Sequence, residues 1–297
     1  MSDLLGARTA TRPQLRRLLD AGSPVLAPGA YDALTARLAE AAGFSTVYMT
    51  GFGTAASLLG RPDVGLLTAT EMADHARRMV AAVDVPVVAD ADTGYGNPIN
   101  VIRTVREYEN AGVAALQLED QVSPKRCGHM AGKAVIPAGE MVAKLEAATA
   151  ARIDPDLLVI ARTDAAAVEG IDAAIERAKR YADAGADLLF VEAPASADDV
   201  RKVASRLKGH RLVFNWVEGG RTPGLPLDEL TDLGFALVLF PIGALLAATR
   251  SVREFYGAIL RDGTPREVLG ELPPFDEFTS FMGLPEIDDL GQRFAER

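Results

Sequence analysis

The only cysteine of the chain, Cys127, lies in a run of charged and polar residues that follows an apolar stretch. The run reads Leu118-Glu119-Asp120-Gln121-Val122-Ser123-Pro124-Lys125-Arg126-Cys127-Gly128-His129. An apolar strand that ends in two carboxylates predicts a site for a hard cation. A lone cysteine flanked by positive charge and glycine is expected to be acidic and mobile. The run therefore indicates metal-assisted chemistry in which a thiol delivers or removes a proton.

Cys127 could instead be a small buried apolar side chain, the usual fate of a free cysteine. Its neighbours Lys125, Arg126 and His129 make burial unfavourable and favour a functional thiol. Other nucleophiles are disfavoured. No lysine ends a predicted strand, as a Schiff-base mechanism would need, and no Ser-His-Asp arrangement is apparent. His75 is expected on a solvated helix face and His210 in a basic loop, and neither is given a role.

Polar residues gather at the ends of the predicted strands. They are Tyr48, Thr50, Asp90, Asp92, Glu119, Asp120, Arg162, Asp164, Glu192, Asn215 and Glu218. Asp90-Ala91-Asp92 is the strongest local signal, because alternation along a strand points both carboxylates to one side. Two such acids repel each other unless a cation or proton intervenes. With Glu119, this oxygen-only set favours Mg²⁺ or Mn²⁺ over zinc; the alternative is a hydrogen-bonded acidic cluster beside Arg162.

Short apolar, β-branched runs alternate with Ala-rich stretches of helical period. Strands are predicted at residues 25–30, 46–51, 86–92, 115–120, 157–164, 188–193, 211–217 and 237–241. Helices are predicted at 32–42, 100–111, 140–152, 170–184, 197–207 and 227–233. Eight continuously apolar strands imply a parallel sheet closed as a (β/α)8 TIM-type barrel. The alternative, a doubly wound sheet, lacks a Gly-rich phosphate fingerprint after its first strand.

The remaining chain is expected to be helical. Residues 251–297 contain no further strand, and Pro273-Pro274-Phe275 marks a break between helical pieces. We therefore expect one α/β-barrel domain over residues 1–297, with the barrel at about 15–250 and a C-terminal helical segment at 251–297.

Composition narrows the function classes. The 297 residues are 48% hydrophobic and 24% charged, which suits a globular protein with a large core. The net charge of −10 and the lack of a basic cluster argue against a nucleic-acid partner. A single cysteine fits a reducing compartment. The first residues lack the pattern of a signal peptide, and no apolar run is long enough to span a membrane. A cytoplasmic protein is expected.

Several motifs together resemble the isocitrate lyase and phosphoenolpyruvate mutase superfamily, over roughly residues 15–294. They are Gly29-Ala30-Tyr31-Asp32-Ala33-Leu34, Tyr48-Met49-Thr50-Gly51, Pro62-Asp63-Val64-Gly65, Asp90-Ala91-Asp92-Thr93-Gly94-Tyr95-Gly96, Glu119-Asp120-Gln121, Lys125-Arg126-Cys127-Gly128-His129, Ala161-Arg162-Thr163-Asp164 and Asn215-Trp216-Val217-Glu218-Gly219-Gly220. The similarity is greatest to the methylisocitrate lyase, dimethylmalate lyase and carboxyphosphonoenolpyruvate phosphonomutase group. It implies an α/β barrel that carries Mg²⁺ and acts on 2-oxo or 2-hydroxy acids.

The resemblance also implies roles for individual residues. Asp92 would be the direct metal ligand, with Asp90 and Glu119 reaching the ion directly or through water. A pyruvate-like portion of the substrate would meet the backbone of Thr50, Gly51 and Phe52, the side chain of Tyr48 and the charge of Arg162. The remaining substrate-binding residues would be Asp63, Gly128, Glu192 and Asn215. Residues 121–133 would form a gating loop carrying the catalytic Cys127, Lys125 and His129. Exchange of C-terminal helices between subunits would give a homotetramer.

On this resemblance the first hypothesis is a Mg²⁺-dependent lyase. It would break the C2–C3 bond of a 2-hydroxydicarboxylic acid that resembles 2,3-dimethylmalate or 2-methylisocitrate. The products would be a 2-oxo acid such as pyruvate and a carboxylate, and Cys127 would protonate the departing carbanion. The alternatives are a phosphonomutase, an oxaloacetate hydrolase or decarboxylase, and a catalytically silent metabolite-binding barrel. The intact set of acids, Arg162 and Cys127 speaks against a silent barrel.

Two departures from the family pattern bear on the substrate. Methylisocitrate lyases typically follow Cys-Gly-His with Arg-Pro-Asn-Lys, whereas this chain has Met130-Ala131-Gly132-Lys133. No Lys or Arg lies between Arg266 and Arg293, where those enzymes carry an arginine for a distal carboxylate. A substrate smaller or less charged than methylisocitrate is therefore favoured, and dimethylmalate-type lyases and carboxyphosphonoenolpyruvate mutases resemble this loop more closely.

Overall fold

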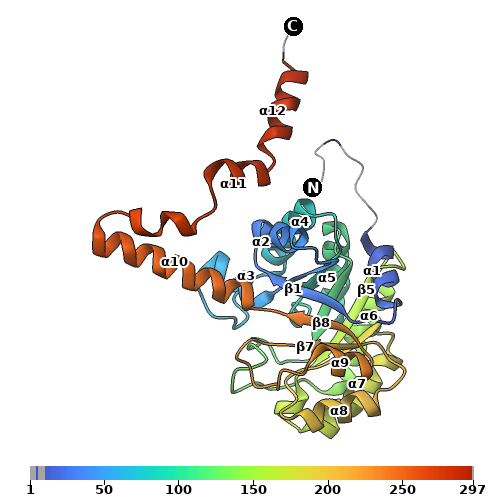
Figure 1. The fold of residues 1–297 in the computed structure, drawn as a ribbon. Coiled ribbons are helices and arrows are strands. Elements are labelled where there is room, and N and C mark those ends of the chain that lie inside the picture. The colour runs from blue at the N-terminus through green and yellow to red at the C-terminus, as the bar shows by residue number, and fades with distance from the viewer. Residues whose placement is uncertain (1–4, 6–10, 296–297) are drawn as a thin grey trace. The chain divides into compact units, whose positions relative to one another are not determined.

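A closed barrel of eight parallel strands forms the centre of the fold in the computed structural model, which describes residue 5 and residues 11–295. The strands follow one another round the barrel in chain order (Figure 1). They are β1 Val25–Ala30, β2 Val47–Met49, β3 Val87–Asp90, β4 Ala115–Glu119, β5 Leu158–Thr163, β6 Leu188–Val191, β7 Leu212–Asn215 and β8 Phe235–Phe240. The predicted (β/α)8 barrel is confirmed, although most strands are shorter than predicted.

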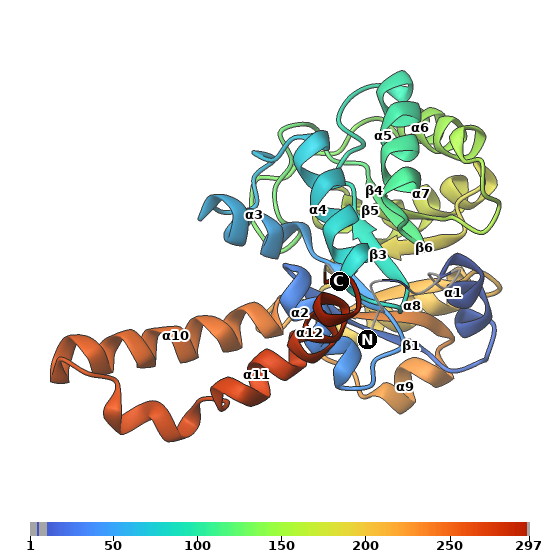
Figure 2. The same ribbon diagram turned by 90° about the horizontal axis from the view of Figure 1, so that it is seen from above.

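Helices surround the strands. In the barrel unit they are α1 Thr11–Leu19, α2 Ala33–Ala41, α3 Gly51–Leu59, α4 Ala69–Ala82, α5 Pro98–Ala111, α6 Ala138–Ala151, α7 Ile171–Asp183, α8 Ala197–Arg206 and α9 Leu227–Asp232, with the short 3-10 turn η1 Ala165–Ala167. Helices α4, α5 and α6 lie side by side outside the barrel (Figure 2). Helices α1 and α3 were not predicted, and α4 was expected only as the helix that carries His75, without bounds. In α3 the Thr50 hydroxyl accepts a hydrogen bond from the Gly53 N–H, so a helix begins where a strand end was expected.

Gly112 and Gly185 lie just after α5 and α7, in the similar sequences Asn110-Ala111-Gly112-Val113-Ala114 and Asp183-Ala184-Gly185-Ala186-Asp187. Both glycines have left-handed backbones, with φ of 90° and 95°, which a residue with a Cβ adopts only at a cost. A buried strand then starts within three residues. These positions explain why the helix-to-strand junctions could be read from the sequence.

Alternation along the strands sorts the buried side chains into two apolar clusters. One cluster contains Val88, Ala115, Ile160 and Phe190, which alternate with residues of the other cluster along their strands. The second cluster contains strand residues that face the surrounding helices. Because side chains of a strand point alternately to opposite faces, the first cluster fills the barrel and the second fills the layer outside it.

The C-terminal unit begins at Leu246, and the structure describes it as far as residue 295. It contains most of α10 Gly243–Asp262, the 3-10 helix η2 Arg266–Glu271, α11 Phe275–Phe281 and α12 Leu284–Arg293. The predicted break at Pro273-Pro274-Phe275 is confirmed, since η2 ends before it and α11 begins within it. Large apolar side chains of this unit are exposed, with Leu260 89% and Phe275 78% accessible. Within the described part of the chain, no helix is both long and apolar enough to cross a bilayer.

Candidate active site

A cavity of about 230 Å³ opens at the carboxyl ends of the strands. Its lining contains twelve of the predicted residues, namely Tyr48, Thr50, Phe52, Asp63, Asp90, Lys125, Cys127, Gly128, His129, Arg162, Glu192 and Asn215. The predicted Gly51, Asp92 and Glu119 are not part of the wall. The rest of the wall is Met130, Val217, Glu218, Gly219, Gly220, Pro241 and Ile242. A larger cavity of about 700 Å³, between α4, α5 and α6, contains none of the predicted site residues.

Asp90 is the last residue of β3 and shares the inward parity of Val88. The prediction that Asp92 continues this alternation is wrong, because the strand ends at Asp90 and Asp92 has a left-handed backbone with φ of 47°. The Asp92 N–H instead donates to Asp90 Oδ1 at 3.0 Å. Burial raises the pKa of both carboxyls, against the attraction of the Lys125 ammonium. This pair of buried acids therefore favours a neighbouring cation.

Lys125 reaches back from the loop between β4 and α6 into this acidic cluster. Its Nζ lies 2.6 Å from Asp63 Oδ1 and 2.7 Å from Asp92 Oδ1, and the residue is 4% exposed. Burial alone would lower the pKa of Lys125, but Asp92 and Asp63 raise it well above its usual value. The ammonium therefore stays charged inside the site.

Arg162, at the inner face of β5, is the second buried cation. Its Nε lies 3.2 Å from Glu119 Oε2 and 2.9 Å from Asp164 Oδ2, and its Nη2 lies 3.6 Å from Glu192 Oε1. The Lys133 ammonium lies 2.8 Å from Asp164 Oδ1 on another side. Burial opposes ionisation of Asp164, but Arg162 and Lys133 together lower its pKa to about 2. Lys133 was not predicted as a site residue, because only the folded loop brings it to β5.

The Cys127 thiol lies in the cavity wall, and the expectation that it is acidic is wrong. Burial, together with the nearby Asp63 and Glu192 carboxylates, raises its pKa more than the backbone of His129 and the charge of Arg162 lower it. The flanking positive charges do not lower the pKa of Cys127 enough to make it acidic, because Lys125 is paired with two carboxylates and the Arg126 side chain is exposed. The raised pKa favours the protonated thiol at neutral pH, as a proton donor requires.

His129 links the Cys127 loop to a second loop after β7. The backbone N–H of Arg221 donates to His129 Nδ1 at 3.0 Å, so the ring proton of the neutral tautomer is on Nε2. This atom lies 3.2 Å from Glu192 Oε1. The Asn215 amide also donates to Glu192 Oε2, at 3.1 Å. Burial alone would raise the pKa of Glu192, but Arg162 and His129 lower it below its usual value. Glu192 therefore stays ionised.

The loop that carries Cys127 is held at its base. The Gln121 side chain accepts from the Arg126 N–H at 2.9 Å and donates to the Arg126 carbonyl at 2.8 Å. Gln121 also pairs with Val135 in an antiparallel bridge. At the other end the Cys127 N–H donates to the Asp63 carbonyl at 3.1 Å. These bonds fix a short turn that presents the thiol to the cavity.

Replacing Gly128 with alanine is expected to lower kcat/KM by about 10²-fold, since misplacing a reacting group by about 1 Å can cost that much. A Cβ at this position would overlap the Glu192 carboxylate and the Arg162 guanidinium. Gly132→Ala is a control on the same loop, because its Cβ would meet nothing closer than 3.8 Å, although its φ of 81° adds strain. Equal steady-state rates for wild type and Gly128→Ala would contradict this close fit of the loop against the two side chains.

The acidic residues of the site suit a divalent cation by charge and donor type. Six buried carboxylates, Asp63, Asp90, Asp92, Glu119, Asp164 and Glu192, face three permanent cations, Lys125, Lys133 and Arg162. Glu119 Oε1 is buried without a hydrogen-bond partner among the described residues. Burial also raises the pKa of Glu119 well above its usual value. Among the described residues, no group of three His, Cys, Asp or Glu side chains is arranged as the ligands of a metal ion would be. Lys125 and Arg162 occupy the positions between them.

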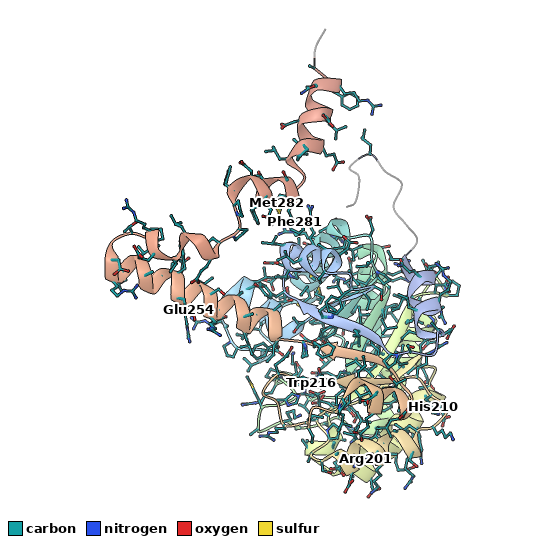
Figure 3. All side chains as sticks on the ribbon, viewed as in Figure 1. Arg201, His210, Trp216, Glu254, Phe281 and Met282 are labelled. Atoms are coloured by element: carbon teal, nitrogen blue, oxygen red, sulfur yellow. The ribbon has the colours of Figure 1, made fainter. Side chains whose placement is uncertain are left out.

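Other predicted polar residues lie elsewhere. Asp120 points outward from the end of β4, where it accepts from Thr163 and Tyr181, each at 2.7 Å, so it is not part of the cavity. The expectation that His75 is solvated is wrong, because it is 7% exposed and its Nε2 lies 2.9 Å from the Tyr31 carbonyl. His210 is at the periphery of the barrel unit, and Trp216 packs on Phe240 beside the site (Figure 3).

Comparison with known proteins finds relatives over most of the chain. Residues 15–260 match the sequence profile of the phosphoenolpyruvate phosphomutase family. A 2,3-dimethylmalate lyase of Eubacterium barkeri is 47% identical, over 96% of this chain and 98% of its own. A chloroplastic carboxyvinyl-carboxyphosphonate phosphorylmutase of Arabidopsis thaliana is 44% identical, over 97% and 86%. A solved phosphonopyruvate hydrolase in complex with oxalate and Mg²⁺ is 32% identical, with a TM-score of 0.86 over 96% of this chain and 100% of its own.

Proposed function

Because the chain belongs to the phosphoenolpyruvate phosphomutase and isocitrate lyase superfamily, we propose that it is a divalent-metal-dependent carbon–carbon lyase. Its substrate is a 2-hydroxydicarboxylic acid of the 2,3-dimethylmalate type, cleaved to a 2-oxo acid and a carboxylate. The observation that carries the proposal is the position of the half-buried Cys127 thiol, which lines the same cavity as Arg162 and Asp90. A carbanion formed by breaking the C2–C3 bond needs such a proton donor.

Asp90, Asp92 and Glu119 are the residues that hold the metal in this proposal. Asp90 lines the cavity and Asp92 does not, so Asp90 is the better direct ligand, and Glu119 offers an unpaired oxygen. An all-oxygen set favours Mg²⁺, with Mn²⁺ as the alternative. The bound ion would act as a Lewis acid toward the substrate oxygens. The solved phosphonopyruvate hydrolase, a structural relative, is a complex with Mg²⁺.

Substrate binding, charge stabilisation and proton transfer are assigned to side chains and backbone groups of the chain. Arg162 neutralises the carboxylate of the 2-oxo portion and the negative charge that develops on its oxygen. The first N–H groups of α3, at Gly51 and Phe52, lack partners within the helix and suit a carboxylate beside Tyr48. The 2-hydroxyl gives its proton to a carboxylate of the acidic cluster, and its oxygen becomes the new carbonyl as the C2–C3 bond breaks. The electron pair of that bond stays on C3, and Cys127 gives C3 its proton. The resulting thiolate then regains the proton that the hydroxyl released. The closed loop keeps water from the intermediate.

The composition of the cavity wall favours an alkyl-substituted acid over a tricarboxylic one. The lining includes the apolar side chains of Met130, Val217 and Ile242. The basic side chains in the wall, Lys125, His129 and Arg162, all face carboxylates of the described chain. A third substrate carboxylate would therefore meet no free positive charge in this wall.

A product assay over a panel of acids tests the proposed activity. The panel is 2,3-dimethylmalate, 2-methylisocitrate, isocitrate and oxaloacetate, each with Mg²⁺. We expect release of a 2-oxo acid from 2,3-dimethylmalate at least about tenfold faster than from 2-methylisocitrate, and loss of that activity with a chelator. The factor corresponds to about 1.4 kcal/mol, well within the cost of desolvating a carboxylate that meets no free positive charge. Activity on oxaloacetate alone would instead support a hydrolase or decarboxylase.

A phosphonomutase is the second candidate, because the Arabidopsis thaliana relative is named as one and is nearly as similar as the lyase. It would rearrange a bond to phosphorus in the same cavity. The phosphonomutase would replace the lyase proposal if none of the four acids gave a product and phosphorus NMR showed rearrangement of carboxyphosphonoenolpyruvate.

We also propose that the protein is a homotetramer of the cytoplasm. The single cysteine fits a reducing compartment. The exposed Leu260 and Phe275 of the C-terminal unit suit burial against another copy. Light scattering of the full chain is expected to give four times the chain mass, and Leu260→Lys together with Phe275→Lys to give a smaller species. A monomeric wild-type protein would contradict the proposed assembly.

A further inference from the structure

The Asp120 carboxylate lies behind the cavity, between the ends of β4 and β5 and helix α7, and is fully buried. Its Oδ2 accepts from the hydroxyls of Thr163 and Tyr181, each at 2.7 Å, and from Arg177 Nη1 at 3.2 Å. Its Oδ1 accepts from the backbone N–H of Asp164 at 2.9 Å. The two oxygens therefore have different partners: Oδ2 is anchored to β5 and α7, and Oδ1 holds the residue that follows β5.

The bond to Asp164 replaces a contact between strands. At the start of β5 the Leu158 N–H donates to the Ala114 carbonyl, and the same pairing, six residues further along both segments, would join the Asp164 N–H to the Asp120 carbonyl. That carbonyl instead accepts from the Ile136 N–H at 2.8 Å. Because a buried N–H without a partner costs free energy, the Asp120 side chain supplies the missing acceptor. The carboxylate thus fixes the Asp164 backbone beyond the last residue of β5.

The Asp164 carboxylate in turn sets the orientation of Arg162. The guanidinium donates to it from Nε to Oδ2 at 2.9 Å and from Nη2 to Oδ1 at 3.1 Å. Two parallel bonds to a planar group fix its direction as well as its distance. The contacts of the guanidinium with Glu119 and Glu192 are longer, at 3.2 and 3.6 Å. A displacement of the Asp164 backbone would therefore move Arg162, which lines the cavity.

We propose that Asp120 is a positioning residue for Arg162: it holds the Asp164 backbone, and through the Asp164 carboxylate the guanidinium, at the place where the substrate carboxylate binds. Asp120 acts from outside the cavity and does not touch the substrate. The inference rests on the proposed function in one respect, namely that Arg162 is the group that binds the substrate carboxylate.

Asp120→Asn alters the contact with Asp164 at almost constant size. Asparagine has one acceptor oxygen, and the three donors around the Oδ2 position favour placing it there. Its NH₂ group then faces the Asp164 N–H, donor against donor. We expect kcat/KM to fall by about 10- to 10²-fold, since a displacement of about 1 Å can cost that much. Thr163→Val removes the other bond between Asp120 and the end of β5, and should lower kcat/KM by about threefold or more.

Tyr181→Phe is the matched control, because it removes a bond to Oδ2 and leaves the bond between Oδ1 and Asp164 in place. Urea unfolding should show lower stability for Asp120→Asn and for Tyr181→Phe. The kcat/KM of Tyr181→Phe, measured where the protein is folded, should nevertheless stay within about twofold of wild type. Equal kcat/KM for these two variants would overturn the proposal and leave Asp120 a role in stability alone.

A double-variant cycle tests whether Asp120 acts through Arg162. Arg162→Lys has already lost the planar group that Asp164 orients, so adding Asp120→Asn should lower its kcat/KM by less than about threefold further. If the losses of the two single variants multiply instead, Asp120 does not act through Arg162.

Crystal structures of wild type and Asp120→Asn separate failure of this inference from failure of the proposed function. The guanidinium of Arg162 should be displaced by roughly 0.5–1 Å in the variant. Such a displacement, with no product from any of the four acids, would support the positioning role and refute the proposed lyase. A guanidinium in the same place in both structures would overturn the positioning role, whatever the activity.

Discussion

Replacing Cys127 with serine is expected to lower kcat by roughly 10²- to 10⁴-fold, the usual contribution of a positioned general acid. Although burial raises the pKa of the thiol, a serine hydroxyl is still a far weaker acid. The two side chains are close in size, so the loop contacts of Cys127, made by its backbone, should survive. Substrate KM and Mg²⁺ affinity should therefore change little.

The pH profile gives an independent test of the same role. Because the thiol must carry its proton, kcat should be retained at neutral pH and fall as the pH rises past the ordinary thiol value of 9.0, at a pH set by the raised pKa. Steady-state rates between pH 6 and pH 11 measure this fall of kcat at high pH, and circular dichroism checks that the fold is retained. An unchanged kcat in Cys127→Ser, or a rate that rises with thiol ionisation, would refute the assignment of Cys127 as proton donor.

Strand alternation explains why much of the site could be predicted from the sequence. Ile160 and Arg162 lie two residues apart on β5, and Phe190 and Glu192 are spaced in the same way at β6. The apolar member of each pair packs inside the barrel and the polar member reaches the rim. The same rule, counted from the inward Ala115 of β4, places Asp120 outside. Counting this parity would have removed Asp120 from the predicted set of polar residues around the cavity.

The features that the sequence could not predict depend on tertiary contacts. Lys125 was expected to place positive charge beside Cys127, yet the loop turns it inward onto Asp63, 62 residues earlier in the chain. The same inward turn removes the charge that was expected to make the thiol acidic. Asp92 left the strand pattern because β3 ends two residues early. By contrast, α4 had a readable start, since Thr68 and Glu71 form a capping box.

Replacing Arg162 with glutamine is expected to have the largest combined effect on stability and activity. The change leaves Glu119, Asp164 and Glu192 buried without their shared guanidinium, and removing one partner of a buried ion pair costs about 3–5 kcal/mol. It also removes the charge that binds the substrate carboxylate, so kcat/KM should fall by roughly 10²- to 10³-fold or more. Urea unfolding and steady-state kinetics measure the two losses separately.

Arg162→Lys distinguishes a structural role from a catalytic one. A lysine keeps the positive charge among the three acids, so most of the lost stability should return. Its single ammonium cannot reproduce the planar fork that donates to both Asp164 oxygens and still faces the cavity. Activity should therefore remain at least about 10²-fold below wild type even where the fold is as stable. Recovery of stability and activity together would mean that only the charge matters, and Arg162 would then neutralise the acids without orienting the substrate.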